Sequence, residues 1–124
     1  MMKIEKLNLL IEEIKKDIGT GLLATDIYYS ADAQSIAGFN SQPKACALFN
    51  RVTNDLKNSL NDAKFPPLGN YYLMELDGDN MVVVVAMEDY QWGMLLDKTK
   101  VPLGLLLNVI IPKVIEQFKD VLKS

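Results

Sequence analysis

The spacing of apolar residues at the start of the chain predicts an amphipathic helix over residues 3–18. Apolar side chains recur there at steps of three and four, and charged side chains take the opposite face. Gly19 follows this stripe at a position typical of the glycine that ends a helix. The side chains expected to face the core are Ile4, Leu7, Ile11, Ile14 and Ile18.

The same periodicity predicts two further helices. One is expected over residues 43–63, with Pro43 in the first turn, where a helix tolerates the missing N–H. The stripe expected to face the sheet is Ala45, Leu48, Phe49, Val52, Leu56 and Leu60. The other is expected over residues 101–122, with a kink at Pro112, because a proline inside a helix costs about 3 kcal/mol unless it is accommodated.

Apolar or alternating segments between these helices predict five strands. They span residues 21–29, 34–39, 71–76, 81–87 and 91–96. Every strand-to-strand connection is a short hairpin except the one through residues 43–63. The expected fold is therefore α/β (α+β), a five-stranded, mainly antiparallel sheet with helices on both faces, in the order α-β-β-α-β-β-β-α. We expect residues 1–124 to form a single domain.

The segment 81–87 (MVVVVAM) is apolar at every position, so both faces of the sheet must be covered there. Five strands make a sheet about 24 Å wide, whereas one helix covers about 10–12 Å. Three helices therefore leave part of one face bare, and a second copy of the chain would cover it. Segment 71–75 lacks the Lys or Pro that guards a free edge. The predicted dimer contacts are Tyr71, Tyr72, Leu73, Met74, Glu75, Ala45, Cys46 and Phe49.

Composition narrows the function classes. The chain has 124 residues, no histidine and a formal net charge of -3, which argues against nucleic-acid binding and against histidine-activated nucleophiles. One cysteine allows no internal disulfide and fits a reducing, cytoplasmic location. We find no signal peptide and no segment of the ~20 apolar residues that a membrane span needs. The sequence predicts a non-enzyme with no catalytic residues, no cofactor and no metal ion.

Some local motifs have a structural and a functional interpretation. Residues 19–24 (GTGLLA) match a dinucleotide-binding pattern, but they follow a helix and open a strand, which is the inverse of that motif. Residues 77–80 (DGDN) favour a hairpin turn over a calcium loop, with Gly78 and Asn80 available for positive φ. Cys46 is interpreted as a packing residue rather than a reactive thiol. Trp92 fits a core position as well as a partner-binding position, the latter together with Tyr90.

The ordered set of segments resembles the roadblock (dynein light chain) family. The resemblance rests on residues 11–14 with 19–24, on residues 35–38, on residues 81–86 and on residues 103–106. The first hairpin differs, because its turn reads Asp32-Ala33-Gln34 where the family commonly has Asp-Gly-Leu.

The resemblance implies a profilin-like roadblock fold and a homodimer in which third strands pair and second helices lie together. It also implies a scaffold or regulator of a small Ras-like GTPase, and bacterial relatives act as activating proteins of such a GTPase. The candidate GTPase contacts are Arg51, Asn54, Asp55 and Asn58. The alternative function is a small-molecule sensor with a ligand pocket between helix and sheet.

Overall fold

The structure is a computed structural model that describes residues 3–124. Its elements follow the predicted order, with a short turn of 3-10 helix at Gly19–Gly21 and a π-turn at Leu106–Ile110. The helices are α1 (Lys3–Ile18), α2 (Pro43–Asp62), α3 (Leu103–Leu105) and α4 (Ile111–Lys123). The strands are β1 (Leu22–Tyr29), β2 (Ser35–Phe39), β3 (Tyr71–Leu76), β4 (Asn80–Met87) and β5 (Tyr90–Asp97).

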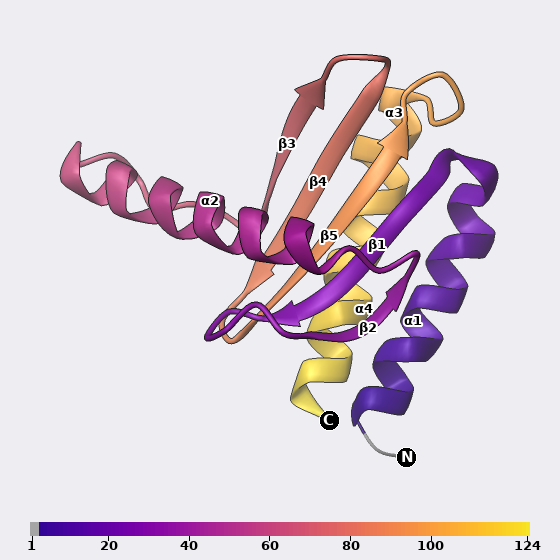
Figure 1. Ribbon diagram of the computed structural model, residues 1–124, viewed down its shortest axis with the longest axis horizontal. Coiled ribbons are helices and arrows are strands. Elements are labelled where there is room, and N and C mark those ends of the chain that lie inside the picture. The colour runs from indigo at the N-terminus through magenta and orange to yellow at the C-terminus, as the bar shows by residue number, and fades with distance from the viewer. Residues whose placement is uncertain (1–2) are drawn as a thin grey trace.

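The strands of the described residues form one antiparallel sheet in the order β2-β1-β5-β4-β3 (Figure 1). Two hairpin units are joined in its centre, where β1 pairs with β5 across a long stretch of sequence. The turn at residues 77–80 has positive φ at Gly78 and Asp79, so Asp79 rather than Asn80 takes the second left-handed position. This order places β3 at one edge of the sheet.

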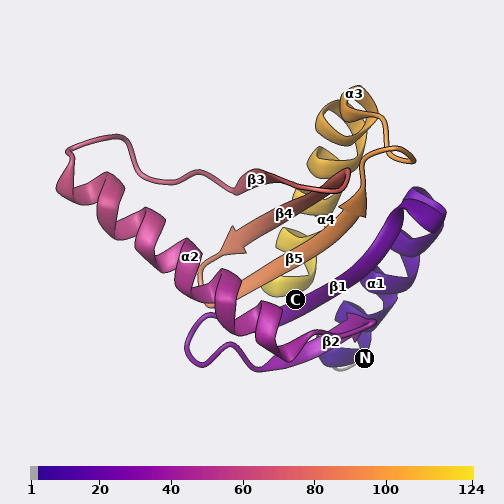
Figure 2. The ribbon, with the colours of Figure 1, turned by 45° about the horizontal axis from the view of Figure 1, so that its top comes forward.

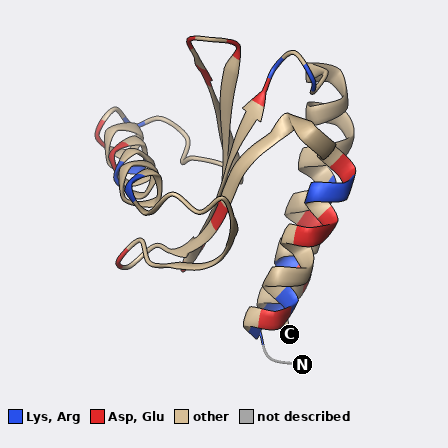
Figure 3. Ribbon diagram, turned by 45° about the vertical axis from the view of Figure 1, so that its right-hand side comes forward, with Lys and Arg blue, Asp and Glu red and all other residues tan. Residues whose placement is uncertain are grey.

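Helices cover the two faces of the sheet unequally. Of the helices in residues 3–124, α1 and α4 pack against each other on one face of the sheet, and α2 lies on the other face (Figure 3). Side chains of β4 alternate between these layers, so that Val83 and Val85 join the main core while Val84 faces α2. The core interpretation of Trp92 is confirmed, because its ring is buried edge-to-face against Phe118 at 5.5 Å between centroids.

The predicted inward stripes of the helices need two corrections. In α1 the buried side chains are Leu7, Leu10, Ile11 and Ile14, whereas Ile4 is exposed in the first turn. In α2, none of the six stripe residues is buried, and the two buried side chains are Cys46 and Thr53. The reason is the path of α2, which crosses the sheet with its first half and then runs past β3 (Figures 1 and 2).

Pro112 lies in the first turn of α4, directly after the π-turn. The N–H of Ile111 bonds to the carbonyl oxygen of Leu106, five residues back. This wider turn places the proline where no backbone donor is needed. The final helical segment accommodates Pro112 in this way.

Candidate interaction surface on the α2 face

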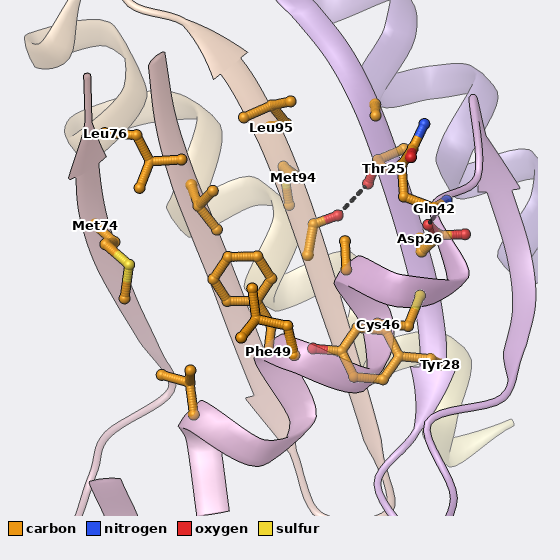
Figure 4. A pocket seen from close by; sticks show the side chains of 16 residues that line it. Thr25, Asp26, Tyr28, Gln42, Cys46, Phe49, Met74, Leu76, Met94 and Leu95 are labelled. Carbon is orange, nitrogen blue, oxygen red and sulfur yellow. Dashed lines mark hydrogen bonds between the residues drawn. The ribbon is translucent and has the colours of Figure 1, made fainter. Parts of the chain in front are cut away.

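An apolar groove of about 360 Å3 lies between α2 and the sheet, open to solvent on one side. Figure 4 shows Phe49 of α2 across the space from Met74 and Leu76 of β3. The helix contributes Ala45, Cys46, Leu48, Phe49 and Val52, and the strands contribute chiefly Ala24, Val82, Leu95, Met74 and Leu76. The groove is the part of the α2 face that one helix leaves uncovered, as the width of the sheet predicted.

The start of α2 is fixed to the sheet by the buried carboxylate of Asp26 in β1. Its oxygens accept hydrogen bonds from Ser35 Oγ at 2.7 Å, from Ser41 Oγ, and from the backbone N–H of Gln42 at 2.8 Å. Among the described residues, Gln42 makes no side-chain cap of its own, so Asp26 caps α2 from the neighbouring strand. A Cβ at Gly38 would lie 2.5 Å from Asp26 Oδ1, so only glycine leaves room for this arrangement.

A second polar anchor holds the middle of α2. Gln91 of β5 is fully buried; its Oε1 accepts from the Tyr28 hydroxyl at 2.9 Å, and its Nε2 donates to Asn50 Oδ1 at 2.8 Å. One turn further, Thr53 Oγ1 and the Tyr72 hydroxyl are 2.8 Å apart. Burial raises the pKa of Tyr28 and of Tyr72, so both phenols keep their protons. Neither the Gln91–Asn50 pair nor the Thr53–Tyr72 pair was predicted from the sequence. The one available signal was Gln91, a polar residue in an apolar strand.

Cys46 belongs to the wall of the groove and is 2% exposed. Burial, with Asp26 nearby, raises the pKa of its thiol to about 12. The thiol is therefore neutral at physiological pH and packs within the protomer, which makes it a poor contact for a second chain.

The other predicted dimer residues lie where a second chain could reach them. On β3, Tyr71 and Glu75 are exposed and the three residues between them are half-buried. On α2, Ala45 and Phe49 line the groove and are half-buried. Among residues 3–124 no strand lies beyond β3, so its outer edge carries unpaired backbone groups.

The predicted GTPase contacts form an exposed row on α2. All four residues, Arg51, Asn54, Asp55 and Asn58, are exposed and none lines the groove. This row and the groove are therefore separate surfaces on the same helix.

Within residues 3–124, no three His, Cys, Asp or Glu side chains gather into a possible metal site. Of the helices in that range, none is both long and apolar enough to cross a bilayer.

The sheet with α1 and α4 on one face and α2 on the other defines a roadblock-like fold, as the order of segments predicted. The chain is similar to MglB of Myxococcus xanthus, with a TM-score of 0.84 and 12% identity over 100% of this chain and 92% of that chain. It is also similar to a Roadblock/LC7 domain from Streptomyces avermitilis (TM-score 0.68, 10% identity, 94% and 98% covered). Profilin IA of Acanthamoeba castellanii shares the fold more loosely (TM-score 0.58, 12% identity, 90% and 94% covered). No protein-family model matches the sequence, and no curated protein is significantly similar to it.

Proposed function

We propose that this protein is a homodimer that regulates or scaffolds a small Ras-like GTPase and has no enzymatic activity of its own. The observation that carries the proposal is the half-covered α2 face, whose apolar groove opens beside the free edge of β3. An uncovered apolar surface of this kind marks a protein contact site. The GTPase partner is supported by the roadblock-like fold and by the family that the sequence resembles.

In the proposed dimer, β3 pairs with β3 of a second copy through Tyr71, Tyr72, Leu73, Met74 and Glu75. Antiparallel pairing would satisfy the free backbone groups and extend the sheet across both protomers. The α2 helix points past β3, toward the side on which the second copy would lie (Figure 2). Each α2 would then cover the other protomer's groove, and the two contacts would be equivalent by two-fold symmetry.

The GTPase would contact the polar row of Arg51, Asn54, Asp55 and Asn58. The row carries both charge signs and lies outside the groove, so a GTPase and a second copy would not compete for it. Cytoplasmic location is part of the same proposal, because Ras-like GTPases act there.

The test combines sedimentation with capture of a panel of purified Ras-like GTPases, each loaded with GDP or with a non-hydrolysable GTP analogue. We expect a dimer at micromolar concentration and capture in one nucleotide state. The double variant Arg51→Ala/Asp55→Ala should lose capture, while Lys119→Ala/Asp120→Ala, an exposed charge pair on α4, should keep it. Failure to capture in either nucleotide state would remove the GTPase from the proposal.

A small-molecule sensor is the second candidate, and the groove volume is the observation that favours it. The groove is open rather than closed, and the Asp26 carboxylate at its end already accepts three hydrogen bonds. Decanoate is a suitable probe, since its chain fits an apolar space of this size. A rise in melting temperature with decanoate, together with loss of the dimer, would favour the sensor.

A further inference from the structure

The two halves of α2 are held very differently. Residues 43–53, the proximal half, are attached to the sheet at three successive points, of which the first is at the N-cap residue Gln42. These are the Asp26 bond to Gln42, the Gln91 bond to Asn50, and the contact between Thr53 and Tyr72. Both buried side chains of the helix, Cys46 and Thr53, belong to this half.

Residues 54–62, the distal half, have no such attachment. Of the side-chain hydrogen bonds and ion pairs found within residues 3–124, none joins this half to another element. Its apolar side chains Leu56 and Leu60 are half-buried, and every other residue in it is exposed. Its neighbours are the residues of its own return loop, where Phe65 is 64% exposed. Figure 1 shows this half beyond the edge of the sheet.

The distal sequence is also a poor helix on its own. It reads NDLKNSLND, and six of its nine residues are Asn, Asp or Ser, which favour helices less than Ala, Leu or Lys do. Asp62 places a negative charge at the negative end of the helix dipole, and the last turn carries no basic residue. The anchored proximal half supplies a helix nucleus, but most of the stability of a helix in a protein comes from tertiary packing of its apolar face. Within the protomer these contacts are limited to the return loop and to the partial burial of Leu56 and Leu60.

We propose that the distal half of α2 is folded only when a second copy of the chain covers it, so that assembly and helix formation are one coupled event. This inference rests on the proposed dimer. The second copy is the occupant because the distal half runs past the free edge of β3, and because the same chain carries both the apolar groove and the apolar side chains of Leu56 and Leu60. Each distal half thus gains burial from the other protomer's groove.

The coupling has a consequence for partner binding. Asn54, Asp55 and Asn58 all belong to the distal half, so three of the four candidate GTPase contacts are placed correctly only in the dimer. A dissociated protomer keeps its sheet, α1 and α4, but it lacks the ordered polar row. Dimer concentration would therefore control GTPase recognition.

The test is amide hydrogen exchange on the full chain, tenfold above and tenfold below the dimer dissociation constant measured by sedimentation. We expect peptides covering residues 56–62 to exchange about fourfold faster after dilution, because the monomer fraction rises from about 0.2 to about 0.85. Peptides from β4 and β5 should not change. The variant Ser59→Ala/Asn61→Ala, which replaces two exposed weak helix formers, should keep its protection after dilution.

Each outcome decides a different claim. If the chain dimerises but residues 56–62 are equally protected at both concentrations, the coupling is wrong and the dimer stands. If the chain is monomeric at every concentration, the proposed dimer fails and the coupling fails with it. If all peptides lose protection together on dilution, the whole protomer depends on assembly, and the special role of the distal half is overturned.

Discussion

Replacing Leu48 with aspartate tests the proposed dimer most directly. Leu48 lies on α2 at the mouth of the groove and is 52% exposed in the protomer. Leu103 of α3 is 53% exposed and does not line the groove. The two substitutions remove nearly the same exposed apolar surface, so Leu103→Asp is a matched control.

The size of the effect follows from the exposed fraction. Complete burial of a leucine side chain is worth about 1.5–3 kcal/mol, so the exposed half of Leu48 would contribute about 1 kcal/mol when a second copy covers it. Two-fold symmetry doubles this to about 2 kcal/mol, or about 30-fold in the dimer dissociation constant. The cost of desolvating the new carboxylate adds to this value, so about 30-fold is the minimum.

Sedimentation equilibrium over a concentration series measures the two constants, and circular dichroism confirms that both variants remain folded. We expect Leu48→Asp to weaken the dimer and Leu103→Asp to leave it within about threefold of the original chain. The reasoning is refuted if both variants weaken it equally, or if neither does, because the α2 face would then not be the contact surface.

Three further predictions concern the anchors of α2. Asp26→Asn places an amide N–H donor next to the three groups that now donate to the Asp26 carboxylate, so it should lower the free energy of unfolding by about 1–3 kcal/mol in urea titration. An unchanged urea midpoint would contradict the capping role of Asp26. Gly38→Ala should destabilise by about 1–3 kcal/mol in the same titration, because the new Cβ would meet Asp26 and the Thr25 carbonyl oxygen, whereas Gly104→Ala, with no atom within 4 Å, should not destabilise. The Cys46 thiol, with its pKa near 12, should resist Ellman's reagent at pH 8 until urea unfolds the chain; rapid labelling of the folded protein would show that the thiol is accessible.

The order of the elements along the chain could be predicted because it depends on local periodicity. Helical steps of three and four, an all-apolar strand and short turns are each contained within a few residues, and they predicted the five antiparallel strands and the two unequal faces. The strand order was not predicted, because it depends on the pairing of β1 with β5, which lie far apart in the sequence. The dimer residues on β3 were chosen because their segment lacks Lys and Pro, and β3 does lie at an edge of the sheet. Their pairing with a second copy remains a prediction.

The burial of α2 could not be predicted from its pattern. A stripe such as Leu48, Val52 and Leu56 indicates which side of a helix seeks an apolar surface, but not whether the same chain supplies that surface. The polar hydrogen bonds that anchor α2 to the sheet could not be predicted for a related reason. Gln91 and Asn50 are 41 residues apart, and nothing local to either one specifies the other.

These two failures have one physical origin, and it explains how the helix can serve as a contact surface. Apolar packing would have fixed α2 by burying its stripe, and that surface would then be lost to any partner. Directional hydrogen bonds to Asp26, Gln91 and Tyr72 fix the position of the proximal half while leaving the stripe uncovered. Each of those bonds has one buried partner, Asp26, Gln91 or Thr53, which limits competition from water, so a few of them can hold a helix that has only two buried side chains. The protomer therefore fixes the position of α2, while the proposed second copy would bury its apolar stripe. The apolar pattern of α2 indicates a buried stripe but not which chain buries it, and for this reason the prediction from the pattern was wrong for the protomer.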